Sequence, residues 1–320
     1  MTRPKILITR RWPETVERYL AERYEVTLNP SDRPLTSAEL AAALQTQDAL
    51  CPTVTDRVTG NILAQANTKI VANYGVGFSH IDIDACNEAG IIVTNTPDVL
   101  TDATADIALT LILMVGRRAG EGEREVRAGR WTGWRPSHLI GTQVTGKTLG
   151  IVGFGRIGRA VARRAHFGFD MRILYHSRSR DERAEQDLHA TYCKDLADLL
   201  ARSDFVSLHC PGGAANRHLF DASVLSHMKR TAFLINTARG EVVDEAALIA
   251  ALQSGAIAGA GLDVYEHEPR VPQALIELEN VVLLPHLGSA TSQTRIAMGM
   301  RVAENLDAFF SGRPPRDRVA

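Results

Sequence analysis

Short apolar runs alternate with amphipathic stretches along the first hundred residues. The apolar runs lie at residues 5–9, 25–28, 49–54, 70–73 and 91–94. Helical patterns between them occupy residues 13–22, 37–46 and 81–89. Short strands that alternate with helices in this way predict a parallel, doubly wound sheet. We therefore expect an α/β domain at the start of the chain.

A second alternating series begins near residue 149. Its apolar runs lie near 149–152, 171–175, 205–208, 232–235, 258–263 and 281–284, with helical patterns between them. A chain of 320 residues is long enough for two hydrophobic cores. The fold class predicted from the pattern is therefore α/β, with two doubly wound parallel-sheet domains.

The first strand of the second series leads directly into a glycine-rich turn. Gly153, Gly155 and Gly158 have the spacing Gly-x-Gly-x-x-Gly, and an alanine-rich helical pattern follows. In dinucleotide-binding folds one glycine makes the tight turn, one lets the pyrophosphate approach and one lets the helix pack on the strand. The N–H groups and dipole of the new helix then face the anion. Glycine-rich turns are common, but this position between a strand and a helix predicts a dinucleotide site.

The residues after the next strand indicate the kind of nucleotide. An acidic residue normally binds the adenosine ribose of NAD at this point, but the chain has Ser177, Arg178, Ser179 and Arg180. Hydroxyl and guanidinium groups bind a ribose phosphate, which a carboxylate would repel. Arginines in a polar loop are also often simply solvated. In this position we interpret them as favouring NADP, with NAD still possible.

The stretch at about 102–127 is predicted to be a helix between the two series. Residues 103–115 are apolar on nearly every face, so such a helix needs partners on all sides. An ordinary central helix of one subunit would also meet that need. The loop that follows contains Trp131 and Trp134, and exposed indoles are typical of interfaces or pocket walls. We expect a homodimer joined through this helix.

Composition excludes several classes of partner. The 36 basic and 37 acidic residues leave a net charge of −1, so no strong field attracts nucleic acid or an anionic membrane. The longest apolar run, residues 107–115, is too short to cross a bilayer. Four scattered cysteines without a Cys-x-x-Cys pair indicate neither a disulfide framework nor a metal site. We expect a cytoplasmic protein with no metal, nucleic-acid or membrane partner.

Three segments of the C-terminal third end apolar runs with polar side chains. They contain Arg239, then Asp263 and Glu268, and finally His286. Ligands bind at the carboxyl ends of strands in open α/β sheets. There an arginine can clamp a carboxylate, a histidine can supply a proton, and a carboxylate can orient that histidine. Each signal alone is modest, because Asp263 or Glu268 could be a cap or a solvated side chain and His267 competes with His286. Together they predict reduction of a 2-oxo acid.

Four motifs taken together resemble those of the D-isomer-specific 2-hydroxyacid dehydrogenases. They are Gly-Phe-Gly-Arg-Ile-Gly at 153–158, Asn-Thr-Ala-Arg-Gly at 236–240, Gly-Leu-Asp-Val-Tyr-Glu-His-Glu-Pro at 261–269 and Leu-Pro-His-Leu-Gly-Ser-Ala-Thr at 284–291. Within that family the chain looks most like the glyoxylate/hydroxypyruvate reductases. That similarity is carried by Tyr-Gly-Val-Gly at 74–77, Trp-Thr-Gly-Trp at 131–134 and the basic stretch after the second strand. The resemblance extends over essentially the whole chain.

The resemblance implies how the domains are arranged and where the cofactor binds. A Rossmann-type cofactor domain of residues 101–286 would be inserted into a flavodoxin-like substrate domain of residues 1–100 and 287–320. At 211–216 the chain reads Pro-Gly-Gly-Ala-Ala-Asn where the family has a Thr-Pro-Glu/Ala-Thr-like turn, so contacts there do not carry over directly. The implied cofactor contacts are Thr104, Gly155, Arg156, Ile157, Ser177, Arg178, Arg180, Cys210, Pro211, Thr237, Asp263 and Gly288.

The resemblance also implies the catalytic and substrate-binding groups. Arg239, Glu268 and His286 would be catalytic. Arg239 and His286 would bind the substrate, with its carboxylate also held by the backbone N–H groups near Val76 and Gly77. The resemblance implies one further substrate-binding residue, Trp134. It matches a tryptophan that, in the reductases, reaches into the partner subunit's active site.

The expected function is NADPH-dependent reduction of glyoxylate or hydroxypyruvate to glycolate or D-glycerate, with His286 as the proton donor. A 2-ketogluconate or other sugar-acid reductase, or a phosphoglycerate dehydrogenase, of the same family is an alternative. No obvious basic cluster for a phosphorylated substrate is present. A protein of a different class, a nucleotide-sensing corepressor that binds peptides, would share the fold without turning over NADPH.

Overall fold

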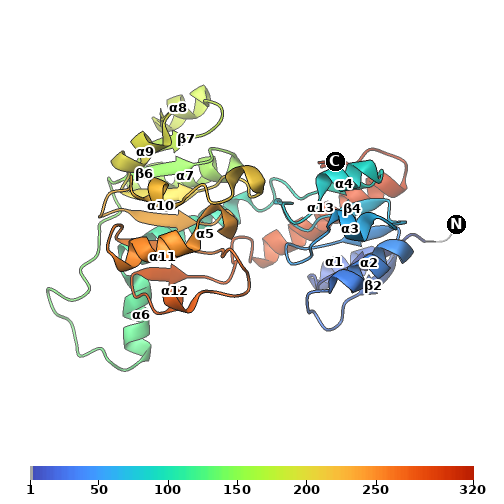
Figure 1. Cartoon of the computed structure of the whole chain (residues 1–320), viewed down its shortest axis with the longest axis horizontal. Coiled ribbons are helices and arrows are strands. Elements are labelled where there is room, and N and C mark those ends of the chain that lie inside the picture. Colours follow the sequence, from blue (N-terminus) through green and yellow to red (C-terminus); the bar gives the residue numbers. More distant parts are fainter. Residues whose placement is uncertain (1–2) are drawn as a thin grey trace. The chain divides into compact units, whose positions relative to one another are not determined.

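The chain divides into two compact units, each built on a parallel sheet. The computed structural model describes residues 3–320. One unit comprises the chain up to Leu100 together with Ser289–Ala320, and the other comprises Thr101–Gly288 (Figure 1). The second boundary expected from the sequence lies after residue 286. Asp263 and Thr104 of the second unit hold the backbone as far as Gly288 by hydrogen bonds, and so place it in that unit.

The first unit is a five-stranded parallel sheet with helices around it. Its strand order, β2-β1-β3-β4-β5, is the flavodoxin-like order. The strands are β1 (Lys5–Ile8), β2 (Glu25–Leu28), β3 (Ala49–Cys51), β4 (Ile70–Ala72) and β5 (Ile92–Thr94). The helices are α1 (Glu14–Ala21), α2 (Ser37–Thr46), α3 (Gly60–Leu63), α4 (Ile83–Glu88) and α13 (Ser292–Phe310). The end of the chain returns to the edge strand, where the Val319 N–H donates to the Val93 carbonyl at 2.8 Å.

The second unit is a seven-stranded parallel sheet of Rossmann type. Its order is β12-β11-β10-β9-β6-β7-β8, so successive strands are added on one side of β6 up to β8 and on its other side from β9 onward. The strands are β6 (Thr148–Val152), β7 (Arg172–His176), β8 (Thr191–Tyr192), β9 (Phe205–Leu208), β10 (Phe233–Asn236), β11 (Gly259–Leu262) and β12 (Val281–Leu283). The helices are α5 (Thr101–Gly116), α6 (Ala119–Arg127), α7 (Arg156–Phe169), α8 (Glu182–Leu188), α9 (Leu196–Arg202), α10 (Ala222–Leu225), α11 (Glu245–Gln253) and α12 (Gln273–Ile276), with short 3₁₀ turns at Ala214–Asn216 and Gly240–Val242. Ligands bind where the strand order reverses in this way in open α/β sheets.

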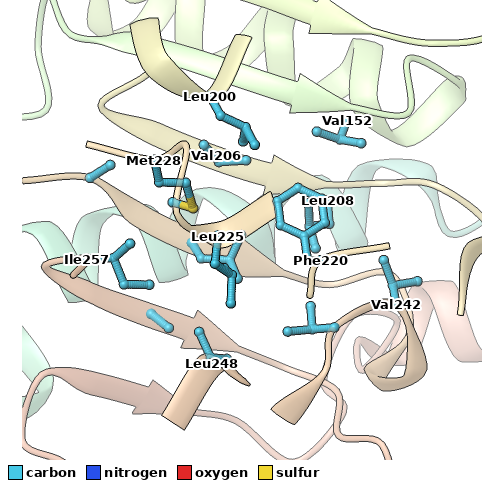
Figure 2. Packing of buried hydrophobic residues seen from close by; sticks show 14 of the residues in the cluster. Val152, Leu200, Val206, Leu208, Phe220, Leu225, Met228, Val242, Leu248 and Ile257 are labelled. Atoms are coloured by element: carbon cyan, nitrogen blue, oxygen red, sulfur yellow. The ribbon is translucent and has the colours of Figure 1, made fainter. Parts of the chain in front are cut away.

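The core of the second unit lies on both faces of its sheet. Strands β6, β9, β10 and β11 are buried along their whole length, as strands of a covered parallel sheet are. On one face, Leu208, Phe220 and Val242 pack in a single hydrophobic cluster (Figure 2). On the other face α5 and α7 pack against the sheet and each other. No helix among residues 3–320 is both long enough and apolar enough to span a membrane.

The predicted strands are present, but the structure differs from the prediction in several elements. Helices α3 and α13 were not predicted. The helix expected over 102–127 is two helices, because the chain turns at Arg118, whose φ of 53° is left-handed and ends regular α-helix. Strand β8 was not predicted, since two residues are too few for a periodic pattern to emerge. The fold class itself, two doubly wound α/β domains with flavodoxin-like and Rossmann-type orders, is confirmed.

Candidate active site

The glycine-rich turn lies between β6 and α7. Gly153 has a φ of 93°, and a Cβ there would lie 2.5 Å from the Cys210 nitrogen. A Cβ on Gly158 would lie 2.3 Å from the Gly153 carbonyl oxygen, which shows how tightly α7 packs on the turn. A Cβ on Gly155 would meet nothing within 4 Å. Only Gly155 therefore faces open space, as a glycine beside a bound pyrophosphate must.

The N-terminus of α7 is suited to an anion. Gly155 is its N-cap residue and contributes no side-chain hydrogen bond to the first turn. The helix runs over 14 residues, and its first residues, Arg156 and Ile157, are two of the expected cofactor contacts. Free N–H groups and a helix dipole attract phosphate. The residues present at this turn therefore fit a dinucleotide.

A second feature that fits a bound group is Thr237, just after β10. Its Oγ1 is buried and has no hydrogen-bond partner within residues 3–320. Buried hydroxyls are normally satisfied, so an unpaired one marks a place for a ligand or a water. Cys210 is half-buried after β9, beside Gly153, and burial raises the pKa of its thiol to about 11. Pro211 follows it and is exposed.

The two arginines of the loop after β7 differ in their contacts. Arg180 makes two hydrogen bonds to Glu185, from Nε at 2.8 Å and from Nη2 at 2.6 Å. Tyr175 donates to the same carboxylate at 2.7 Å, and these bonds lower the pKa of Glu185 to about 2. Arg178 is exposed and makes no ion pair with any described residue. Ser177 bonds to the Ser179 carbonyl. The structure thus leaves Arg178, rather than Arg180, available for a phosphate.

Arg239 stands at the start of the 3₁₀ turn after β10. Its Nη1 donates to the Ala238 carbonyl at 2.7 Å, and its own carbonyl accepts from the Asn236 side chain at 2.9 Å. Burial lowers the pKa of Arg239, while the charges of Glu268 and Glu241 oppose this shift. No ion pair joins Arg239 to another described residue. A half-buried guanidinium without a carboxylate partner is prepared to bind an anionic ligand.

Glu268 and His286 form a hydrogen-bonded pair. His286 Nδ1 and Glu268 Oε2 are 2.9 Å apart, and their side chains are 30% and 32% exposed. The other oxygen of Glu268 accepts from the Tyr265 N–H at 3.1 Å. Burial raises the pKa of Glu268, but the hydrogen bond and charge of His286 outweigh that effect and hold it below its ordinary value. Glu268 therefore stays charged and can orient the imidazole with Nε2 directed away from it.

Asp263 fixes the turn that carries His286. Its two carboxylate oxygens accept from the Leu287 N–H at 2.6 Å and the Gly288 N–H at 2.8 Å. Its carbonyl accepts from the His286 N–H at 2.9 Å. Burial raises the pKa of Asp263. His286 has a φ of 56°, an uncommon backbone conformation for this residue that the surrounding bonds must maintain.

Thr104 completes this arrangement. Its hydroxyl, buried at the start of α5, donates to the Gly288 carbonyl at 3.0 Å. Of the expected cofactor contacts, the structure therefore brings Thr104, Asp263 and Gly288 together. It shows them holding the turn that bears His286.

His267, the competing histidine, lies in a different setting. It is exposed, and its side chain makes no hydrogen bond or ion pair with any described residue. It therefore lacks the carboxylate partner that His286 has.

In the first unit, the loop after β4 offers backbone donors. Asn73 Nδ2 donates to the Gly75 and Gly77 carbonyls at 3.0 and 3.1 Å, and Asn95 Nδ2 donates to the Val76 carbonyl at 2.8 Å. The N–H groups of Val76 and Gly77 have no acceptor within residues 3–320. With its carbonyls turned toward the two asparagines, this loop can present its N–H groups to an anion.

Trp134 lies in the long loop between α6 and β6. Its side chain is 82% exposed and makes no ring contact or hydrogen bond within the part of the chain that the structure describes. Among residues 3–320, no hydrogen bond or cation–π contact joins it to Arg239 or His286. No group of three or more potential metal-binding side chains occurs among residues 3–320.

Several supporting residues were not predicted from the sequence. Glu185 holds Arg180, Glu241 lies beside Arg239, and Glu266 lies beside Glu268. Glu241 and Glu266 are each two residues from a predicted catalytic residue, which is the one sequence signal that could have indicated them. Asn73 and Asn95 gave no signal, because their role depends on two strands lying side by side.

The chain is similar to known proteins over almost its whole length. Residues 109–288 match the model of the D-isomer specific 2-hydroxyacid dehydrogenase, NAD binding domain. A glyoxylate reductase of Thermococcus kodakarensis is 48% identical over 318 residues, covering 98% of this chain and 95% of the relative. A glyoxylate reductase of Pyrococcus horikoshii is 46% identical with the same coverage.

Solved structures of the same family resemble the chain over its full length. An NADPH-dependent glyoxylate/hydroxypyruvate reductase of Sinorhizobium meliloti, in complex with NADP and malonate, has a TM-score of 0.89 and 38% identity, covering 100% of this chain and 97% of that one. A putative D-isomer specific 2-hydroxyacid dehydrogenase of Polaromonas has a TM-score of 0.92 and 36% identity, with both chains fully covered. The nucleotide turn, the arginine and the glutamate–histidine pair thus occur in a chain that belongs to the D-isomer-specific 2-hydroxyacid dehydrogenases, a family of oxidoreductases that use a nicotinamide cofactor.

Proposed function

We propose that this enzyme reduces glyoxylate or hydroxypyruvate with NADPH, giving glycolate or D-glycerate. The observation that carries the proposal is the combination of an unpaired, half-buried Arg239 with the Glu268–His286 pair in the Rossmann-type unit. The named relatives support the choice of substrate, since they are glyoxylate reductases over nearly the same length. A 2-ketogluconate reductase and a peptide-binding corepressor remain the alternatives for the test below.

In the proposed mechanism each residue acts on one part of the 2-oxo acid. Arg239 binds the carboxylate and polarises the adjacent carbonyl, placing fixed positive charge where negative charge develops. His286, protonated and held by Glu268, gives its proton to the carbonyl oxygen through Nε2. When bound, the nicotinamide supplies the hydride that C2 receives.

The test is NADPH oxidation, followed by absorbance, with a panel of 2-oxo acids and with both cofactors. We expect kcat/KM to be highest for glyoxylate or hydroxypyruvate with NADPH. A preference for 2-ketogluconate would change the proposed substrate but not the proposed reaction. An absence of turnover with every 2-oxo acid would reject the enzyme proposal and favour the corepressor.

We further propose that NADP is preferred over NAD because Arg178 binds the ribose phosphate. The double variant Ser177→Asp, Arg178→Ile should weaken NADPH binding by roughly 1.5–3 kcal/mol, as expected for loss of a hydrogen bond to a charged group. NADH binding should be retained or improved, since an aspartate can accept from the ribose hydroxyls. Titration of cofactor fluorescence measures both affinities.

Arg183 provides the control for this variant. It lies on α8 and is exposed, and within residues 3–320 its one ion pair is with Asp187 at 3.5 Å, so Arg183→Ile should leave both affinities unchanged. A wild type that already has a higher kcat/KM with NADH would show that the cofactor proposal is wrong.

We also propose a homodimer. Helix α6 and the first part of the loop after it extend away from the rest of the second unit (Figure 1). Four large apolar side chains of α6 and this loop are exposed, and α5 leaves a partly covered apolar face. Exposed apolar residues gathered on one segment are typical of an interface. The exposed residues are Val126, Trp131, Trp134 and Ile140.

The dimer proposal predicts the size of the particle in solution. Light scattering at micromolar concentration should give twice the mass of the 34.9 kDa chain. Trp134→Ala should change substrate preference more than cofactor affinity, because we place this side chain at the partner's active site. A monomer at that concentration would contradict the proposal.

All four cysteines are free thiols, which supports a reducing compartment such as the cytoplasm.

A further inference from the structure

Residues 213–218, which we call the brace segment, follow the expected cofactor contacts at 210–211. They include the turn in which the chain departs from the family pattern. Gly213 has a φ of 101°, a conformation that favours glycine, and its carbonyl accepts from the Asn216 N–H at 3.0 Å. The turn is therefore a defined structure, and the brace segment contacts the loop of Arg239 and the loop of Glu268.

The first contact is with the loop of Arg239. The Gly213 N–H donates to Glu241 Oε1 at 2.6 Å, and the His218 N–H donates to the Glu241 carbonyl at 2.8 Å. Glu241 follows Arg239 by two residues, and its negative charge helps to offset the burial of that guanidinium. Glu241 thus joins the brace segment to Arg239 by hydrogen bonds and by charge.

The second contact is with the loop of Glu268. Arg217 Nη2 and His218 Nε2 bind Glu266 Oε1 at 2.6 and 2.8 Å. The side chain of Glu266 is only 10% exposed, and its N–H donates to Glu245 Oε1 at 2.9 Å. Burial raises the pKa of Glu266, but the bonds from His218 and Arg217 hold it below its usual value. Glu266 is therefore a charged anchor two residues before Glu268.

The two catalytic loops also contact each other directly. A Cβ on Gly240 would lie 1.9 Å from the Tyr265 carbonyl carbon, so the backbones are in close contact there. Below them, the Phe220 N–H donates to the Val242 carbonyl at 3.0 Å, and both side chains belong to the buried cluster (Figure 2). The brace segment and both loops consequently form one packed assembly in which a displacement of one part displaces the others.

We propose that Glu241 and Glu266 are positioning residues that act through the brace segment. Glu241 sets the position of Arg239, which binds substrate, and Glu266 sets the position of Glu268, which orients the proton donor. This inference rests on the proposed function. The two residues are expected to affect different kinetic constants. Loss of Glu241 should raise KM for the 2-oxo acid, and loss of Glu266 should lower kcat.

The experiment compares Glu241→Ala and Glu266→Ala with the corresponding glutamine variants, using glyoxylate and saturating NADPH. Glu241→Ala should raise KM about tenfold, and Glu266→Ala should lower kcat about tenfold, as expected for one lost charge-assisted bond. Glutamine keeps an acceptor for the Gly213 N–H and for Arg217 but loses the negative charge, so each glutamine variant should recover part of the loss. Glu277→Ala, in an exposed glutamate bonded only to Gln273, is the control and should match the wild type.

Two further readouts separate positioning from simple stability. NADPH affinity and the melting temperature are measured for every variant, and kinetics are compared below the lowest melting temperature. If both alanine variants melt earlier but keep the wild-type KM and kcat, the brace segment is only structural and the proposal is wrong. The proposal would also be wrong if Glu241→Ala lowered kcat and Glu266→Ala raised KM. A wild type inactive with all 2-oxo acids would instead reject the proposed function.

Discussion

His286→Ala is expected to lose about 10²–10⁴-fold in kcat for glyoxylate reduction, the usual contribution of a general acid. The side chain is the one imidazole in this unit that pairs with a predicted catalytic carboxylate, at 2.9 Å from Glu268. NADPH should still bind, because the glycine-rich turn and the loop after β7 do not depend on the imidazole. Stopped-flow absorbance measures the chemical step, and cofactor fluorescence measures binding.

Two companion variants test the assignment of the proton donor. His267→Ala should change little, since that side chain is exposed and makes no hydrogen bond or ion pair with any described residue. Inactivation by His267→Ala, with His286→Ala active, would show that the assignment is wrong. Glu268→Gln should be milder than His286→Ala and should move the alkaline limb of the pH profile for reduction to lower pH.

The sign of that shift follows from the charge on Glu268. Its pKa is held below the ordinary value, so the wild-type residue is a carboxylate throughout the neutral range. A negative charge stabilises the protonated form of a neighbouring imidazole, and glutamine does not. The protonated donor is therefore lost at lower pH in the variant. A limb that stays in place or moves to higher pH would contradict this role of Glu268.

Arg239→Lys is expected to reduce kcat/KM for glyoxylate roughly 10–100-fold, which corresponds to about 1.5–3 kcal/mol for hydrogen bonds to a charged group. An ammonium cannot reproduce the planar fork of a guanidinium. The loop cannot easily shift to compensate, because Gly240 packs directly on the Tyr265 backbone. Most of the loss should appear in KM, while NADPH affinity stays near that of the wild type.

The control for this variant is Arg172→Lys at the exposed start of β7, which should leave kcat/KM unchanged. Calorimetric titration with oxalate, an unreactive dicarboxylate, provides a readout that needs no turnover. Unchanged kcat/KM and unchanged oxalate affinity in Arg239→Lys would exclude Arg239 as the carboxylate clamp.

The fold was predictable because local pattern and topology agree in this chain. Apolar runs become parallel strands, and the Gly153–Gly158 turn lies where the strand order reverses. Arg239, Glu268 and His286 could be proposed as site residues because each follows a strand at the same edge of the sheet. Their local geometry, including the Glu268–His286 hydrogen bond, could be seen only in the structure.

Other features depend on contacts between distant segments, which a local pattern does not contain. Glu266 meets Arg217 across 49 residues, and Gly213 meets Glu241 across 28. The engagement of Arg180 by Glu185 was also not evident, although both were visible as charged residues near the second strand. The break at Arg118 arose from a backbone conformation that helical periodicity does not indicate.

The most direct test of the central claim is transfer of a labelled hydride. The enzyme is incubated with hydroxypyruvate and NADPH that carries deuterium on the transferable face of C4, and the product is examined by mass spectrometry and chiral chromatography. The account predicts D-glycerate with one deuterium at C2. Unlabelled glycerate, the L-isomer, or no product at all with either hydroxypyruvate or glyoxylate would contradict it.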